Sequence, residues 1–375
     1  MKIKSLLTFL SLLIFPLLLS AQNYNLVIGT YTNPGKSEGI YVYRFNVNTG
    51  EYTYKSKAAI HNPSFLTVSR NKNFVYAVSE AGNGNGTVSA YKFNSASGEL
   101  AFLNKESSGG DDPCYISIDD NNKYVFVGNY SGGNVAAISV KDDGSLNSDL
   151  QVVQHQGNSI NASRQEKPHV HASVLSPDNR YLFTPDLGTD KVNIYHVNLT
   201  NTSQPLSPVA IPFNAVQPGS GPRHITFHPN GQSAYLVQEL NGMVTFYKYK
   251  EGRLKAKQSI TMLSDAFKGK VGAADIHVSP DGKFLYATNR GDANELVIYS
   301  INKKGTLKFV GRQSTLGETP RNFSIDPTGN YLLVANQTTD DIIIFKRNHQ
   351  TGLLTPTGKK IEVSSPVCLQ FVAEN

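Results

Sequence analysis

Residues 222–240 read PRHITFHPNGQSAYLVQEL, a pattern that predicts two antiparallel strands joined by a tight turn. Apolar and polar residues alternate before the turn signal HPNG at residues 228–231, and an apolar run follows it. An antiparallel hairpin brings the start of its first strand beside the end of its second. We therefore expect Arg223 and His224 to lie near Glu239, at the edge of the sheet opposite the turn.

The same hairpin pattern recurs with a period of about 50 residues. A third apolar run follows each hairpin, and a fourth, weaker run follows a glycine, which indicates four strands per repeat. Repeats of this length and content are typical of β-propellers. The other hairpins begin at Pro63, Pro113, Pro168, Ala273 and Pro320.

The two ends of the chain complete the count of repeats. Residues 366–371 (PVCLQF) predict an opening strand with no partner after it. Residues 26–31 and 39–45 predict a second and a third strand with no opening strand before them. Pairing the two ends would close the ring and remove two exposed sheet edges. The sequence thus predicts an all-β, seven-bladed β-propeller with four-stranded blades, in which the C-terminal strand completes the N-terminal blade.

Residues 1–21 have the features of a secretory signal peptide. Lys2 and Lys4 precede an apolar run over residues 6–19, which is too short for a comfortable membrane span. We expect removal of this segment to leave a single propeller domain over residues 22–375, periplasmic or secreted and without stable membrane insertion. No feature of the sequence predicts an oligomeric state.

Composition narrows the classes of function. The formal net charge is +6, and no dense run of Lys and Arg occurs, so nucleic-acid binding is not expected. Cys114 and Cys368 fall in opening strands of different blades and are expected to be buried thiols rather than a disulfide framework. The chain has neither a Gly-rich phosphate loop between strand and helix nor a Gly-x-Ser-x-Gly motif.

Comparing the repeats position by position singles out candidate site residues. The opening strands of a propeller line its central channel, so polar residues at their starts should face a shared opening. Three residues after the start of each repeat, His171 is the only polar residue among aliphatic residues and Phe, which favours a functional role for it. One residue after the start, the repeats carry Ser64, Cys114, His169, Arg223, Ala274, Arg321 and Val367. The ends of the second strands are Thr30, Glu80, Asn129, Asp186, Glu239, Asn289 and Asn336, and Arg290 follows Asn289.

Four of these residues form the predicted catalytic set. His171, Arg223, Glu239 and Arg290 come from three consecutive blades and should point toward one mouth of the channel. Arginine binds carboxylate or phosphate and stabilises a developing oxyanion, and His or Glu can act as a general base on water. This chemistry suits a small anionic lactone or carboxylate and needs no redox cofactor.

A metal site is the weaker alternative. His169 and His171 in PHVH lie on one side of a strand, and Asp275 and His277 form a second pair, but two ligands at a time are a modest signal. We therefore expect no metal and no other cofactor.

Several motifs give the chain a family resemblance. The sequence resembles the bacterial propeller lactonases, which include propeller-type 6-phosphogluconolactonases and a fungal carboxymuconate-lactonising enzyme. The resemblance implies a seven-bladed propeller with a cleft lined by a His, two Arg and a Glu, which fall on His171, Arg223, Arg290 and Glu239. The motifs are GTYTNPGKSEGIYVYRFN (29–46), HASVLSPDNRYLF (171–183), GPRHITFHPNGQSAYLVQEL (221–240), ADIHVSPDGKFLYATNRG (274–291) and PRNFSIDPTGNYLLVANQ (320–337). The predicted substrate-binding neighbours are His169, His224, Arg321, Asp275 and His277.

Three functions fit these residues. The first is a lactone hydrolase, in which Arg223 and Arg290 hold the anion and polarise the carbonyl while His171 or Glu239 activates water. The second is a carboxy-cis,cis-muconate cyclase that uses the same cleft, and the third is a non-catalytic extracytoplasmic propeller that binds a glycan or a protein. A location outside the cytoplasm, where phosphorylated sugar lactones are scarce, favours an unphosphorylated sugar or uronic-acid lactone.

Overall fold

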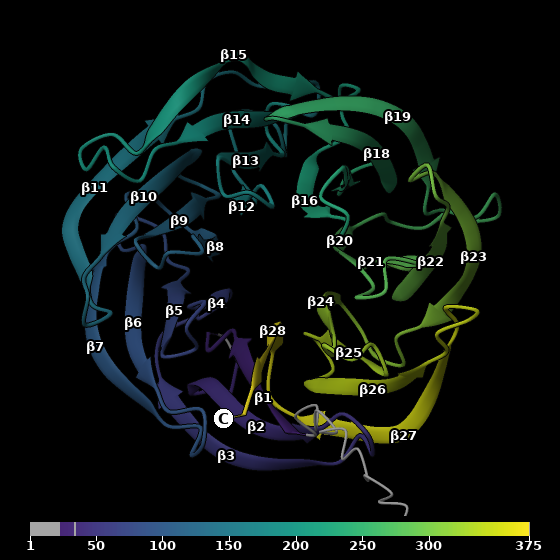
Figure 1. Ribbon diagram of the computed structural model, residues 1–375. Coiled ribbons are helices and arrows are strands. Elements are labelled where there is room, and N and C mark those ends of the chain that lie inside the picture. Colours follow the sequence, from purple (N-terminus) through teal and green to yellow (C-terminus); the bar gives the residue numbers. More distant parts are fainter. Residues whose placement is uncertain (1–22, 34, 375) are drawn as a thin grey trace, which may run out of the picture.

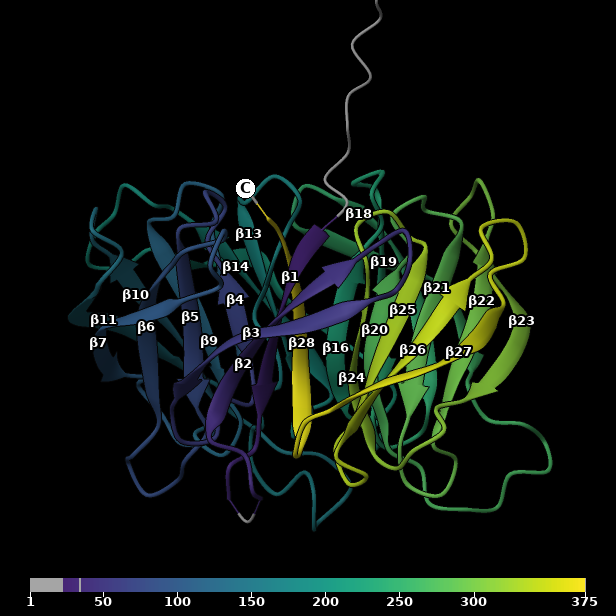
Figure 2. The ribbon, with the colours of Figure 1, turned by 90° about the horizontal axis from the view of Figure 1, so that it is seen from below.

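Seven four-stranded antiparallel sheets surround a central channel in the computed structural model, which describes residues 23–33 and 35–374 (Figure 1). Seen from the side, the sheets form a disc with loops on both faces (Figure 2). In the described part of the chain, no helix is long and apolar enough to cross a membrane. The predicted signal peptide, residues 1–21, lies outside the described residues.

Each blade contributes one strand to each of four concentric layers. The innermost strands are β4 (Leu66–Val68), β8 (Pro113–Ile118), β12 (Val174–Leu175), β16 (Pro222–Phe227), β20 (Ala273–Val278), β24 (Pro320–Ile325) and β28 (Pro366–Ala373). The second layer is β1 (Asn23–Thr30), β5 (Phe74–Ser79), β9 (Tyr124–Asn129), β13 (Tyr181–Asp186), β17 (Ser233–Gln238), β21 (Phe284–Asn289) and β25 (Tyr331–Asn336). The third layer is β2 (Gly39–Asn46), β6 (Thr87–Phe93), β10 (Asn134–Val140), β14 (Lys191–Val197), β18 (Met243–Lys250), β22 (Glu295–Ile301) and β26 (Asp341–Arg347). The outermost layer is β3 (Tyr52–Ala59), β7 (Leu100–Ser107), β11 (Leu146–Gln154), β15 (Leu206–Ala215), β19 (Arg253–Thr261), β23 (Leu307–Ser314) and β27 (Leu354–Glu362).

The last strand of the chain completes the first blade, as predicted. Strand β28 pairs antiparallel with β1, and the sheet order is β28-β1-β2-β3. This pairing covers the edge of β1, and β28 becomes the innermost strand of its blade. The predicted fold, a seven-bladed propeller with four strands per blade, is confirmed.

Buried apolar side chains of the second and third layers hold neighbouring blades together. Strands β9, β17, β21 and β25 are buried along their whole length, because each blade lies between two neighbours that cover its two faces. A tyrosine contact repeats between blades: the hydroxyl of Tyr76 donates to the Gly144 carbonyl at 2.9 Å, and Tyr235 and Tyr286 do the same to Gly305 and Gly352. The core is therefore a ring of inter-blade contacts, and it leaves the channel mouth free for polar groups.

The register of the fourth blade differs from the sequence alignment. In the fifth blade, a bulge follows the first residue of the inner strand. Pro222 pairs with Gln238 and His224 pairs with Val237, so Arg223 lies in the bulge. In the fourth blade the first pair is Val170 with Asp186, although the prediction placed Pro168 there.

This register places His171 in the bulge that Arg223 occupies in the next blade. The predicted position of His171 among aliphatic residues is therefore wrong by two residues. Glu80 and Glu239 also lie one residue beyond the ends of β5 and β17, rather than at their ends.

Candidate active site

Two sets of equivalent positions build the site at one mouth of the channel. The first is the bulge of the inner strand, and the second is the residue directly after the second strand. In every blade the backbone N–H of this second residue donates to the carbonyl two residues before the bulge position, which holds the two positions side by side. The bulge positions are Ser64, Cys114, His171, Arg223, Ala274, Arg321 and Val367. The residues after the second strands are Tyr31, Glu80, Tyr130, Leu187, Glu239, Arg290 and Gln337.

A cavity of about 320 Å³ lies among these side chains. Its volume falls at the lower end of the range for small-molecule sites and suits a molecule the size of a monosaccharide. Its lining is polar and mostly charged. The lining residues are Glu80, Cys114, Tyr130, Arg164, His171, Glu239, Arg290 and Arg321.

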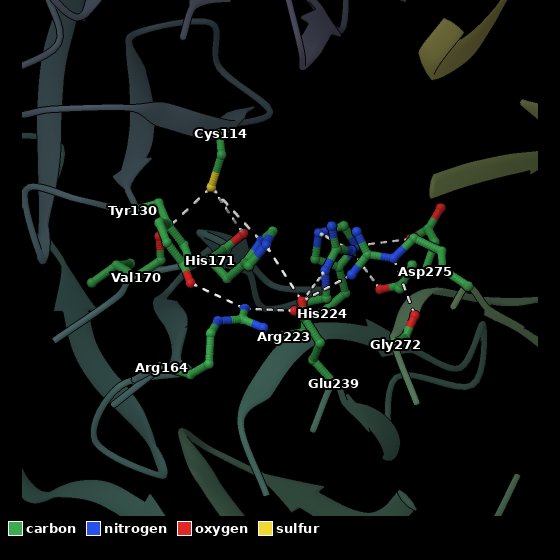
Figure 3. Close-up of polar contacts among 12 residues, drawn as sticks. Cys114, Tyr130, Arg164, Val170, His171, Arg223, His224, Glu239, Gly272 and Asp275 are labelled. Carbon is green, nitrogen blue, oxygen red and sulfur yellow. Dashed lines mark hydrogen bonds and ion pairs between the residues drawn. The ribbon is translucent and has the colours of Figure 1, made fainter. Parts of the chain in front are cut away.

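The buried Glu239 is the centre of an ion cluster (Figure 3). Its Oε2 atom lies 3.0 Å from Nε of Arg223 and 3.1 Å from Nη2 of Arg290, and its Oε1 accepts from Nη2 of Arg164 at 2.7 Å. Burial by itself would raise the pKa of Glu239, but the three guanidinium groups outweigh it and lower the pKa to about 2. Glu239 is therefore ionised at neutral pH and has little basicity.

His171 brings a buried imidazole to the cavity. Its Nε2 lies 4.0 Å from Oε2 of Glu239, its Nδ1 lies 3.7 Å from Sγ of Cys114, and its ring meets that of Tyr130 edge to face. Burial, reinforced by the positive charge of Arg223, holds the pKa of His171 well below its usual range. The imidazole is therefore neutral near pH 7 and can take a proton.

Arg321 brings a guanidinium group without a carboxylate partner. Within residues 23–33 and 35–374 no acidic side chain lies within ion-pair distance of it, and it sits over the ring of Tyr31 at 5.2 Å. The Tyr31 hydroxyl donates to both oxygens of Glu80, at 2.9 and 2.8 Å. Arg321 and Tyr31 also line a neighbouring cavity of about 600 Å³.

The charges that line the cavity are unbalanced. Three guanidinium groups, those of Arg164, Arg290 and Arg321, share the lining with two carboxylates, those of Glu80 and Glu239. Because His171 is neutral, the cluster carries an excess of positive charge in a poorly solvated place. Such a site attracts a small anion and can stabilise negative charge that develops on a carbonyl oxygen.

The structure brings the four predicted catalytic residues together, but not in equivalent places. His171, Glu239 and Arg290 line the cavity, as does Arg321, which the sequence predicts as a substrate-binding residue. Arg223 is 2% exposed and lies behind Glu239, where its Nη1 donates to the Ala274 carbonyl at 2.6 Å. Arg223 therefore acts on the cavity through Glu239.

The other predicted substrate-binding residues do not line the cavity. His169 stacks on Tyr130 at 4.5 Å and its Nε2 lies 3.1 Å from Oε1 of Glu166. His224, Asp275 and His277 form a network beneath Arg223.

The pair His169–His171 does not form a shared ligand set, because only His171 reaches the cavity. In the part of the chain that the structure describes, no group of three or more His, Cys, Asp or Glu side chains is arranged to hold a metal ion.

Four cavity residues were missed as site residues from the sequence: Glu80, Cys114, Tyr130 and Arg164. A signal exists for three of them, because Cys114 shares the bulge position with His171 and Arg223, and Glu80 and Tyr130 share the position of Glu239 and Arg290. Aligning the repeats on the hairpin turn would have found them. Arg164 lies in an irregular loop between β11 and β12, and no periodic pattern points to it.

The fold and the cavity define a β-propeller protein with an arginine-rich cavity at the mouth of its channel. The chain belongs to the seven-bladed β-propeller lactonases, because the family model described as "Lactonase, 7-bladed beta-propeller" matches residues 25–371. This match confirms the resemblance seen in the sequence and places the chain in a family of lactone-hydrolysing enzymes.

Curated and solved relatives agree with the family. A 6-phosphogluconolactonase of Formosa agariphila is 38% identical over 351 residues, which are 92% of this chain and 98% of the relative. A 6-phosphogluconolactonase of Bacillus subtilis is 36% identical over 352 residues, or 92% of this chain and 97% of that protein. The structure of a periplasmic gluconolactonase of Pseudomonas aeruginosa is 41% identical, with a TM-score of 0.90 and coverage of 94% of this chain and 100% of that one.

Proposed function

We propose that this protein hydrolyses a sugar-derived lactone in the cavity beside His171. The observation that carries the proposal is a neutral, buried imidazole at the edge of an arginine-rich cavity of monosaccharide size. The names of the relatives, 6-phosphogluconolactonase and gluconolactonase, support the same substrate class.

In the proposed reaction, Nε2 of His171 takes a proton from a water molecule as the water oxygen bonds to the lactone carbonyl carbon. Arg290 and Arg321 stabilise the negative charge that develops on the carbonyl oxygen. The bond between this carbon and the ring oxygen then breaks, and the imidazolium returns its proton to the leaving oxygen. The product is an open-chain hydroxy acid, and the imidazole is again neutral.

Between the two candidate bases, the proposal selects His171. Glu239 has a pKa of about 2 and is shared by three arginines, so taking a proton from water would cost it those ion pairs. Its proposed role is to hold Arg164, Arg223 and Arg290 in place. The cyclase and the non-catalytic binder remain the alternatives.

We also propose that the chain acts in the periplasm or is secreted, after removal of residues 1–21. The charge and apolar pattern of this segment supports the proposal, as does the similarity to a periplasmic gluconolactonase. N-terminal sequencing of the protein from a periplasmic extract should begin at Gln22, and an intact Met1 would contradict the proposal.

The function is tested by acid release from gluconolactone and its 6-phosphate, after subtraction of their spontaneous opening in water. The native protein should accelerate the opening, and His171→Ala should lower kcat by roughly 10²- to 10⁴-fold. The control His196→Ala, on β14 outside the cavity, should have the native kcat. The ratio of the kcat/KM values for the two lactones reports whether the arginines bind phosphate. If neither lactone is opened and a carboxymuconate loses its ultraviolet absorbance instead, the protein is a cyclase; no turnover of any of them would favour the binder.

A further inference from the structure

A chain of buried hydrogen bonds leads away from the cavity behind Glu239 (Figure 3). The Nε of Arg223 donates to Oε2 of Glu239 at 3.0 Å, and the Nη1 of Arg223 lies 3.3 Å from Nε2 of His224. On the other side of its ring, Nδ1 of His224 lies 2.8 Å from Oδ1 of Asp275. Asp275, His224 and Arg223 are at most 6% exposed, so water does not compete for these bonds.

The donors and acceptors along this chain fix the tautomer of His224. A guanidinium group has N–H donors and no acceptor, so Nε2 of His224 must supply the lone pair that meets Arg223. The proton of the ring is then on Nδ1 and is donated to the carboxylate of Asp275. Burial and the charge of Arg223 lower the pKa of His224 to about 4, so the ring carries a single proton at neutral pH.

Asp275 also joins the inner strands of four neighbouring blades. Its Oδ2 accepts from Nδ2 of Asn322 at 2.6 Å and lies 2.9 Å from Nε2 of His277. The Oδ1 of Asn322 in turn accepts from the backbone N–H of Leu369 at 2.8 Å. Through His224 on β16, Asn322 on β24 and Leu369 on β28, the carboxylate on β20 is held rigidly.

A second buried His–Asp pair provides a comparison. The Nδ1 of His155 lies 2.8 Å from Oδ2 of Asp186, and the ring also meets the Tyr195 hydroxyl at 3.0 Å. His155 directly follows β11 of the third blade, and its ring contacts go to β13 and β14 of the fourth blade without including a cavity residue. The two pairs match in burial and distance, but only the pair of His224 and Asp275 leads to Arg223.

We infer that His224 and Asp275 are positioning residues for the reaction in the cavity. Asp275 holds the Nδ1–H tautomer of His224, and the free Nε2 of His224 holds Arg223 in the orientation that fixes the carboxylate of Glu239. Glu239 in turn orients Arg164 and Arg290 toward the substrate. The expected effect on kcat rests on the proposed lactone hydrolysis, whereas the assignment of the His224 tautomer does not.

The kinetic test compares two substitutions of one residue. In His224→Gln the amide can accept from Arg223 and donate to Asp275, whereas His224→Leu can do neither. We expect His224→Leu to lower kcat roughly 10-fold or more, because a small misplacement of reacting groups is costly, and His224→Gln to recover most of this loss. The matched control His155→Leu should lower Tm without lowering kcat. Equal kcat losses in the Gln and Leu variants, or an equal loss in the control, would overturn the inference.

A spectroscopic test works even if the protein opens no lactone. With ¹⁵N-labelled histidine, the signals of His224, assigned by their loss in His224→Gln, should show a protonated Nδ1 and an unprotonated Nε2 in the native protein. Asp275→Asn should shift them toward a mixture of tautomers. A native His224 protonated on Nε2 would contradict the inference, whereas the correct tautomer in a protein without lactonase activity would contradict only the proposed function.

Discussion

The arginines around the cavity lower the pKa values of His171 and Glu239 alike. For the imidazole this means a neutral ring, since burial and the positive field both oppose its protonation. For the carboxylate it means a permanent charge, since the arginines outweigh burial. Near neutral pH the two side chains, 4.0 Å apart, therefore have different roles. His171 is a neutral proton acceptor, and Glu239 is a charged partner that holds the arginines.

The pH dependence of turnover should report the pKa of His171. The reaction needs the neutral ring, which is lost as the pH falls through a pKa held well below 6.5. We expect kcat/KM to stay level from pH 7.5 to 6.5 and to fall only at lower pH, measured by acid release with the spontaneous rate subtracted. An acid limb at or above pH 6.5, or one that persists in His171→Ala, would rule out His171 as the base.

The ion cluster of Glu239 should contribute to stability in a pH-dependent way. Its pKa is lowered from 4.5 to about 2, so its contribution is complete above pH 4.5 and is lost as the pH falls toward 2. At pH 7, Glu239→Gln should lower the free energy of unfolding by about 3–5 kcal/mol, because buried arginines lose their partner. Urea unfolding at pH 7 and pH 3 measures the difference, which should shrink at pH 3. An equal difference at both pH values would contradict this account.

Residue types at the site were predictable where they break the pattern of the repeats. Arg223, Glu239 and Arg290 stood out because they come from consecutive blades and should point toward one mouth of the channel. His171 was found for a wrong reason, since the alignment placed it at an aliphatic position. The contact of Arg164 with Glu239 joins residues 75 positions apart through a loop, and no local pattern encodes it.

At the scale of the element, the hairpin turn is a better reference than the first residue of the inner strand. In the fourth blade, the bulge residue His171 lies five positions before the turn residue Ser176. The spacing is the same in the fifth blade, where Arg223 lies five positions before His228. The turn is set by local backbone bonds. The start of the strand depends on the preceding loop, which is longer before the fourth blade.

That loop also offers an element-level test of Arg164. A Cβ on Gly188, in the turn after β13, would lie 1.8 Å from the Lys167 carbonyl oxygen, so Gly188→Ala must displace the loop that carries Arg164. We expect lower kcat/KM in the acid-release assay and a lower Tm.

Gly311→Ala on β23 is the control for this variant, because its Cβ would meet only a side-chain atom of Leu353, at 3.4 Å. Native kinetics in Gly188→Ala would show that the position of Arg164 does not matter for turnover.

The whole molecule depends on the closure of the ring by β28. Removing residues 366–375 would leave the inner edge of β1 unpaired and uncover the apolar side chains that pack against Cys368 and Leu369. We expect the shortened chain to lose cooperative thermal unfolding by circular dichroism and to aggregate in gel filtration, whereas a chain ending at Glu374 should behave as the full chain. A monomeric shortened chain with native Tm would show that closure is dispensable.

The sequence by itself determined the number of blades, the four strands in each and the closure by the last strand. Those features follow from alternating apolar residues, turn signals and their period, which are local properties of the chain. Only the tertiary structure decided that His171 shares the bulge of Arg223, that Arg223 lies behind Glu239, and that Arg164 completes the cluster. Register and side-chain direction depend on hydrogen bonds between strands and on contacts between distant blades, which a single repeat does not encode.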